Sequence, residues 1–276
     1  MNDKIKIAWF GKHFGEEPPF VGEENQGAGG IFFTGCNLRC CFCQNYQISQ
    51  ENIGDKFYSI IELADIMIIL QNDNVTCIDL VSPTIWYKQI KESIKIAKGK
   101  GLKIPIVWNS NGYEDIEIIK EMNGFVDVYL PDFKYSNNEV GLKYSGIENY
   151  KEKAISAIKE MYNQVGNLKK QKPKTKNQNR GLVVRHLILP NSLDNSFGVL
   201  DEIVKIDKNI YISLMSQYNP LYNAKNYEEI NRRLTQEEFD KVLNYQLNIG
   251  LENGWHQELD SSDCFVPDFK KVNPFE

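Results

Sequence analysis

Residues 29–47 have the sequence GGIFFTGCNLRCCFCQNYQ, and the rest of the chain is organised around this stretch. The apolar run 31–33 predicts a buried strand, and it leads directly into a loop that carries Cys36, Cys40 and Cys43. Three thiolates in one loop indicate a metal site. Structural zinc prefers four protein ligands, whereas an iron–sulfur cluster needs one ligand per iron and can leave its fourth iron open. The loop therefore predicts an iron–sulfur cluster with one open iron.

Cys41 is a fourth thiol in the same loop, so a closed structural zinc site made with Cys36, Cys40 and Cys43 is the alternative. The adjacent side chains of Cys40 and Cys41 point in different directions, which favours Cys41 as a small apolar filler. A disulfide is less favoured. Residues 1–10 lack the apolar core of a secretory signal, and the cytosol keeps thiols reduced. We therefore expect cysteine ligands in a cytoplasmic protein.

Length and charge limit the class of protein. The 276 residues suit one α/β domain, and the net charge of −5 with interspersed charges argues against a nucleic-acid binder. No apolar run reaches the roughly 18–20 residues that cross a bilayer, so we expect no membrane association. Cys77 and Cys264 are isolated and are expected to be structural thiols.

The hydrophobic pattern after the cysteine loop alternates between helix and strand. Six strands with intervening helices imply parallel strands with right-handed crossovers, and six units predict a partial (β/α)6 barrel of TIM type rather than a complete eight-unit barrel. After the first strand, strands are predicted over 76–81, 104–108, 126–130, 182–189 and 210–215. Helices are predicted over 59–70, 84–98, 114–122, 150–165, 197–206 and 236–249.

The remaining segments are predicted to surround one domain that spans 1–276. An irregular lead-in (1–28) is expected to pack across one end of the partial barrel (29–250), and a polar tail (251–276) is expected on the surface. Segment 167–180 is rich in lysine and lacks apolar periodicity, which predicts a solvated insert. A docking patch for an acidic partner is the alternative for this segment.

In barrels of this kind the chemistry lies at the carboxyl ends of the strands. Turn formation explains many polar residues at such positions. It does not explain two charged residues, Asp132 and Lys134, beside one buried strand end, nor Arg185 within a strand. The strand ends therefore predict a polar site at one mouth of the barrel.

The spacing of the three cysteines, with aromatic Phe42 before the last one and a strand before the loop, resembles the signature of the radical S-adenosylmethionine (radical SAM) superfamily. More narrowly, the segments RHLILPN (185–191) and SQYNP (216–220) look like stand-alone relatives of the pyruvate formate-lyase activating enzymes, which activate glycyl radical enzymes. The resemblance implies a [4Fe–4S] cluster and SAM as cofactors. It also implies reductive cleavage of SAM to a 5′-deoxyadenosyl radical that abstracts hydrogen from a substrate.

By this resemblance Lys134 pairs with the SAM carboxylate, Asp132 binds ribose or a cation, and Phe42 borders the adenine. The family's Gly-Gly-Glu after the second strand is replaced here by VSPT (81–84), so backbone carbonyls and the hydroxyl of Ser82 or Thr84 are expected to receive the SAM amino group. A family histidine near the end of the sixth strand is replaced by Gln217. The full set of candidate SAM contacts is Phe42, Ser82, Pro83, Thr84, Asn109, Asn111, Asp132, Lys134, Arg185, His186 and Gln217.

The same resemblance implies a reducing electron carrier, flavodoxin or ferredoxin, as a partner. It implies two kinds of substrate: a glycyl radical enzyme, for which a broad mouth is expected, or a small molecule or peptide modified directly, for which an enclosed pocket is expected. A structural metal-binding protein is the alternative outside catalysis.

Overall fold

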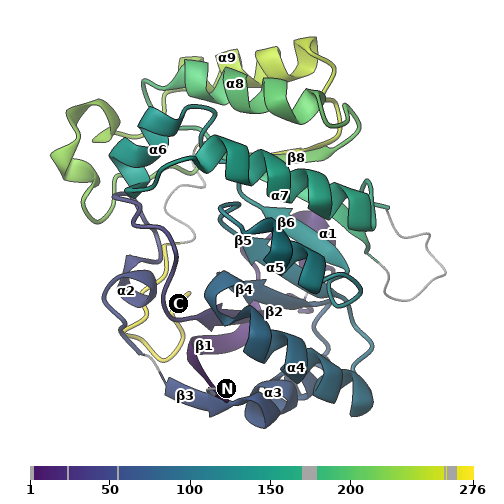
Figure 1. Ribbon diagram of the computed structural model, residues 1–276. Helices are drawn as coiled ribbons and strands as arrows, with labels where there is room; N and C mark the ends of the chain where they lie inside the picture. Colours follow the sequence, from purple (N-terminus) through teal and green to yellow (C-terminus); the bar gives the residue numbers. More distant parts are fainter. Residues whose placement is uncertain (1–2, 24, 55, 170–178, 258, 260–265) are drawn as a thin grey trace.

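The computed structural model describes residues 3–23, 25–54, 56–169, 179–257, 259 and 266–276, and these form one sheet flanked by helices (Figure 1). The strand order in this nine-stranded sheet is β3-β1-β2-β4-β5-β6-β7-β8-β9. The strands are β1 (Lys4–His13), β2 (Ala28–Phe33), β3 (Lys56–Ser59), β4 (Ile78–Val81), β5 (Ile106–Ser110), β6 (Val128–Pro131), β7 (Gly181–Leu187), β8 (Tyr211–Met215) and β9 (Gly254–His256).

The run from β2 to β8 contains the six predicted parallel strands, and the sheet does not close on itself. The prediction of a partial (β/α)6 barrel is therefore confirmed. The register brings the strand ends together: Phe32 of β2 is level with Val81 of β4, and Val81 is level with Asn109 of β5. The loops after these strands consequently leave the sheet at one shared edge.

Helices connect the parallel strands, and α3 packs against α4, α5 against α7 and α8 against α9 (Figure 1). Strands covered in this way are apolar: all four residues of β4 are buried, and its Ile78 and Leu80 belong to the main core. The helices are α1 (Pro18–Val21), α2 (Tyr46–Ser49), α3 (Ile60–Asn72), α4 (Tyr87–Gly99), α5 (Ile116–Glu121), α6 (Asn138–Ser145), α7 (Tyr150–Val165), α8 (Leu193–Val204) and α9 (Gln236–Asn248), with short 3-10 turns at Thr84–Trp86, Ala224–Asn226 and Glu228–Ile230.

The start of α9 is fixed by a capping box. The Thr235 hydroxyl accepts a hydrogen bond from the backbone N–H of Glu238 at 3.2 Å, and the Glu238 carboxylate accepts one from the backbone N–H of Thr235 at 3.0 Å. Gly250, with φ of 85°, follows the helix in a left-handed conformation. Both features follow from residue types at set positions, and the helix begins at the predicted residue and ends at Asn248, one residue before the predicted end.

The prediction of an irregular lead-in (1–28) is wrong for residues 4–13. Residues 4–13 form β1, which pairs antiparallel with β2 and β3 at one edge of the sheet. The alternation of exposed Lys4 with buried Ile5 and Ile7 is a period-two pattern typical of such a strand.

The predicted surface tail is also wrong in part. β9 pairs with β8, Leu251 is fully buried, and Phe269 is buried against Phe32. The prediction for the basic insert falls mostly on residues 170–178, which lie outside the described residues, as does Cys264. No helix in the described part of the chain is both long and apolar enough to cross a membrane.

Candidate active site

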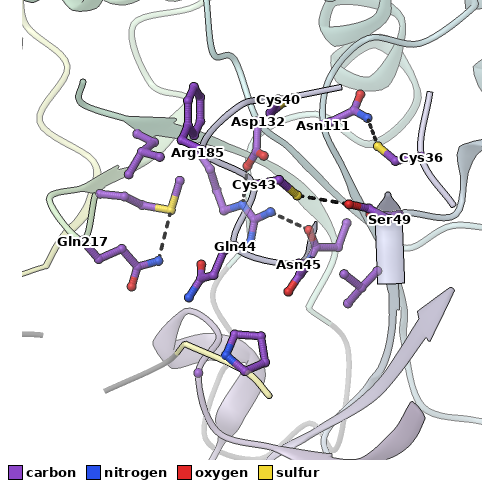
Figure 2. A pocket seen from close by; sticks show the side chains of 18 of the residues that line it. Cys36, Cys40, Cys43, Gln44, Asn45, Ser49, Asn111, Asp132, Arg185 and Gln217 are labelled. Atoms are coloured by element: carbon purple, nitrogen blue, oxygen red, sulfur yellow. Dashed lines mark hydrogen bonds and ion pairs between the residues drawn. The ribbon is translucent and has the colours of Figure 1, made fainter. Parts of the chain in front are cut away.

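The cysteine loop leaves the carboxyl end of β2 and borders a cavity of about 220 Å³. Cys36, Cys40 and Cys43 all line it, and Figure 2 labels all three among the residues around the pocket. The other residues that line the cavity include His13, Gly15, Glu16, Phe42, Ser82, Asn109, Asn111, Asp132, Lys134, Arg185, Met215, Gln217, Pro267 and Phe275.

The loop around Cys40 is held by the carboxyl end of α6. The backbone N–H of Arg39 donates to the carbonyl of Ser145 at 3.1 Å, and the N–H of Cys41 donates to the carbonyl of Tyr144 at 2.8 Å. On the other side, the carbonyl of Cys41 accepts from the N–H of Asn223 at 2.8 Å. The Cys41 side chain is buried in the main core and is not among the cavity-lining residues, as expected for an apolar filler.

Each of the three cysteine sulfurs has a polar side chain beside it. Figure 2 shows Asn111 directed at Cys36 and Ser49 directed at Cys43; the Asn111 Nδ2 and Ser49 Oγ atoms lie 3.3 and 3.2 Å from the respective sulfurs. The Ser145 Oγ atom lies 2.9 Å from the Cys40 sulfur, and these contacts come from three separate elements.

The donor set fits an iron–sulfur cluster. Among the described residues, no group of three or more His, Cys, Asp or Glu is arranged to hold one metal ion. A four-iron cluster spans more space because each thiolate binds a different iron. Burial raises the pKa of the Cys40 thiol to about 12, so bound iron has to displace its proton. Three thiols that line one cavity and have polar neighbours provide the ligands that such a cluster needs.

Three charged side chains, Lys134, Asp132 and Arg185, form a row of ion pairs in the cavity beside the strands β6 and β7. Asp132 accepts from Lys134 Nζ at 2.5 Å through one oxygen and from Arg185 Nε at 2.8 Å through the other. Burial alone would raise the pKa of Asp132, but the charges of Arg185 and Lys134 outweigh burial and lower it. Asp132 is therefore ionised between two cations.

The loop after β1 lines the cavity through Gly15 and Glu16, and we call this part of the lining the floor. The Glu16 carboxylate lies 3.5 Å from Arg185 Nη1, 3.4 Å from Asn109 Nδ2 and 3.5 Å from His13 Nε2. Burial alone would raise the pKa of Glu16, but contact with His13 and the charge of Arg185 lower it. Asn109 also accepts from Arg185 Nη2 at 2.5 Å, so this floor is a connected polar network.

Two further carboxyl groups, those of Glu17 and Asp79, are buried beside these residues. Each has one oxygen with no hydrogen-bond partner among the described residues. Burial raises the pKa of Glu17 to about 7 and, together with the charge of Glu16, raises that of Asp79 well above its ordinary value. A carboxyl group that keeps its proton lowers the cost of this burial.

Eight of the predicted SAM contacts line the cavity and three do not. Thr84 is turned to the buried carboxylate of Glu114, to which its hydroxyl donates at 2.9 Å. His186 is fully buried between the Phe133 carbonyl and the Ser196 hydroxyl, each at 2.8 Å from a ring nitrogen. Burial lowers its pKa to about 4. Pro83 directly precedes the 3-10 turn Thr84–Trp86 and is likewise absent from the lining.

The backbone brings two of the strand ends close together. Gly112 has φ of 76°, and a Cβ there would lie 2.0 Å from the carbonyl oxygen of Asp132, so only glycine allows the loop after β5 to approach β6. Ser82 also has a positive φ, 58°, and its N–H donates to the Asn109 carbonyl at 2.9 Å. Strained non-glycine residues of this kind cluster at functional sites.

None of the predicted site residues came from the segments before and after the partial barrel, although both segments line the cavity. His13, Gly15 and Glu16 belong to the segment predicted as an irregular lead-in, and Pro267 and Phe275 to the predicted surface tail. The Phe275 ring lies 4.2 Å from the His13 ring, centroid to centroid. The density of aromatic residues in both segments was the signal that they pack together.

Comparison with known proteins identifies the family. The model of the radical SAM superfamily matches residues 31–167, which include the cysteine loop and the strands β4, β5 and β6. The chain belongs to the radical SAM superfamily. The cofactors of this superfamily are a [4Fe–4S] cluster and SAM, as the sequence resemblance implied.

One curated relative of this radical SAM protein is the uncharacterized protein MJ0674 of Methanocaldococcus jannaschii, 35% identical over 249 residues. The match covers 87% of this chain but 66% of the relative, so the chain spans just under two thirds of that protein's length.

Two solved structures share the fold. Streptococcus suis SuiB bound to its precursor peptide SuiA matches with a TM-score of 0.58 at 12% identity, over 83% of this chain and 48% of that one. SuiB bound to S-adenosylmethionine matches with a TM-score of 0.55 at 13% identity, over 83% and 47%. This radical SAM chain thus spans about half the length of SuiB.

Proposed function

We propose that this chain is a radical SAM enzyme that holds one [4Fe–4S] cluster on Cys36, Cys40 and Cys43 and cleaves SAM reductively. The observation that carries the proposal is the single cavity that these thiols share with Lys134 and Asp132. When bound, the cluster supplies the electron that splits SAM into methionine and a 5′-deoxyadenosyl radical, which takes hydrogen from the substrate. The chain's own share of the work is binding, orientation and exclusion of water.

Lys134 would bind the SAM carboxylate, because an ammonium group has three donors and Asp132 occupies one of them. Ser82 and nearby carbonyls would accept from the SAM amino group, and Phe42 would border the adenine. Asp132 would bind ribose or a cation. Asn109, Asn111, Arg185 and Gln217 remain candidates because they line the cavity, whereas Pro83, Thr84 and His186 are withdrawn.

The substrate we favour is a small polar molecule. The N-terminal loop and the tail both line the cavity, which narrows the space for a folded partner, and Glu16 and Arg185 make its floor charged. Activation of a glycyl radical enzyme is the second candidate, supported by the sequence similarity of 185–191 and 216–220 to activases. It requires that a peptide loop enters, and SuiB, which shares the fold, was solved with a bound peptide.

A flavodoxin or ferredoxin would supply the electron, and a reducing cytoplasm would keep the cysteines free for iron. These partners and this location are part of the proposal. An acidic carrier could use the basic segment 167–180.

The experiment is the assay of 5′-deoxyadenosine formed from SAM by anaerobically reconstituted, dithionite-reduced protein. Cys40→Ala should abolish the product, while Cys41→Ala, in the same loop but outside the cavity lining, should keep the cluster and the activity. Full iron and sulfide loading without 5′-deoxyadenosine, with or without the cell extracts described below, would overturn the proposal. Stoichiometric zinc without sulfide in the purified protein would do the same.

A second assay separates the two kinds of substrate. Cell extract divided by size into small molecules and proteins is added to the reduced enzyme. Faster 5′-deoxyadenosine formation with the small-molecule fraction supports direct modification. A protein-dependent glycyl radical signal in electron paramagnetic resonance spectra supports the activase role instead.

A further inference from the structure

We propose that three polar side chains raise the reduction potential of the cluster by each donating a hydrogen bond to a ligating sulfur. They lie on different elements and are Ser49 of α2, Asn111 after β5 and Ser145 of α6. The inference rests on the proposed function, because it takes Cys36, Cys40 and Cys43 as the cluster ligands.

The contact to Cys40 is part of a short buried chain of hydroxyl groups. Ser145 Oγ lies 2.9 Å from the Cys40 sulfur and 2.7 Å from the Tyr135 hydroxyl. Ser145 and Tyr135 are fully buried. A cysteine bound to iron has no proton to give, so Ser145 has to be the donor to Cys40. Ser145 has one proton, so Tyr135 has to donate to Ser145, and this donation strengthens the next hydrogen bond in the chain.

The same reasoning gives the direction of the contact to Cys43. Ser49 Oγ lies 3.2 Å from the Cys43 sulfur, and an iron-bound sulfur can only accept. Ser49 is itself buried at the end of α2 and also accepts from Gln50 Nε2 at 3.3 Å. Its hydroxyl proton is therefore available for Cys43.

The orientation of the Asn111 amide is fixed by its neighbours. Its carbonyl oxygen accepts from the N–H of Tyr113 at 2.9 Å. Its Nδ2 then faces Asn37 Oδ1 at 2.7 Å and the Cys36 sulfur at 3.3 Å. The amide nitrogen, rather than the oxygen, is consequently the group directed at Cys36.

Reduction adds one electron to a cluster, and donors beside the sulfurs stabilise the added negative charge. Loss of a donor should therefore make the potential more negative. A distorted loop that admits water should shift the potential the other way, because water also stabilises the reduced form. The sign of the shift separates loss of a hydrogen bond from general damage.

The test is a dithionite and mediator titration, monitored by electron paramagnetic resonance, of reconstituted full-length protein. The variants are Ser145→Ala, Ser49→Ala and Asn111→Leu. Tyr135→Phe keeps Ser145 in place and serves if Ser145→Ala fails to load iron. Ser93→Ala is the matched control, because Ser93 is a buried serine of α4 that donates to backbone carbonyls. Ser49→Thr retains the hydroxyl and should restore the wild-type potential.

We expect a negative shift in each variant with full iron and sulfide loading, a smaller negative shift in Tyr135→Phe, and no shift in Ser93→Ala. An unchanged or more positive potential in fully loaded variants would overturn the inference and leave the proposed function intact. Wild-type protein that cannot hold iron and sulfide would overturn both.

Discussion

The ammonium group of Lys134 lies 2.5 Å from one carboxylate oxygen of Asp132, whose other oxygen accepts from Arg185. One carboxylate thus joins a flexible cation to a rigid guanidinium that also contacts Asn109. Lys134 keeps donors for a ligand, whereas Arg185 is engaged by the protein. Replacing Lys134 should therefore mainly weaken ligand binding, whereas replacing Arg185 should mainly lower stability.

Lys134→Met should weaken SAM binding. Loss of one charge-assisted hydrogen bond costs about 1.5–3 kcal/mol, which corresponds to a dissociation constant raised roughly 10- to 150-fold. Calorimetric titration of cluster-loaded protein with SAM measures the change. Lys120→Met, which removes an exposed lysine paired with Glu117 on α5, is the control. Equal affinity in wild type and Lys134→Met would refute this role.

Arg185→Met should chiefly destabilise the fold. It leaves the buried carboxylates of Asp132 and Glu16 without their cation, and breaking a buried ion pair costs about 3–5 kcal/mol. Denaturant unfolding measures the loss. Adding Asp132→Asn to the variant should recover part of it, since one unpaired charge is then removed. A double variant less stable than Arg185→Met would contradict the assignment.

His186→Gln should lower stability without changing the affinity for SAM. The ring holds two buried hydrogen bonds and is not among the cavity-lining residues. Unfolding free energy should fall by about 1–3 kcal/mol. If the SAM dissociation constant rose instead, His186 would have to be returned to the site.

Arg185 and His186 show how much of the site could be predicted from the sequence. Neighbouring residues of a strand point to opposite faces of the sheet, so the side chains of Arg185 and His186 could not both face the barrel interior. The charged residue, Arg185, was enough to identify the polar face of β7. The strand count and the cysteine loop followed from local patterns. The strand β1, which lies between β3 and β2, was missed because its signal, the alternation of lysine and isoleucine, is only four residues long before aromatic residues and glycine interrupt it.

The packing of distant segments could not be predicted in the same way. α6 is short, and its role depends on backbone contacts with the cysteine loop about a hundred residues earlier. Glu16 faces Arg185 only because β1 runs antiparallel to β2 and the loop after β1 turns into the barrel. Such contacts are non-local, and no periodicity within one segment encodes them.

Glu114→Gln should stabilise the protein more at high pH than at low pH. Burial raises the pKa of Glu114 to about 7, from 4.5. Between these values the folded protein binds a proton that the unfolded chain releases, so rising pH costs stability until about pH 7. The variant removes this cost, and its advantage over wild type should grow by about 3 kcal/mol between pH 4.5 and 8. Unfolding at both pH values checks this, and parallel pH curves would refute it.

Phe275→Ala should expose the cluster to oxygen. The Phe275 ring lines the cavity and packs against Trp9, His13 and Phe32. Loss of cluster absorbance in air should be faster in the variant. Val272→Ala is the control from the same tail, because Val272 is 98% exposed. Equal bleaching rates in all three proteins would show that the tail gives no protection.

The contacts that hold the cysteine loop also set an order of events during synthesis. Cys41 is held by Tyr144 and Asn223, and the Gln47 side chain is held by residues 268–269. Ribosomes add about 5–20 residues per second, so the last of these contacts becomes possible roughly 10–45 s after the cysteines are made. Until then the segments that surround the three thiols in the folded protein are not all in place. We therefore expect cluster insertion to follow translation, and we expect the carrier that delivers iron and sulfide to recognise the finished barrel rather than the nascent loop.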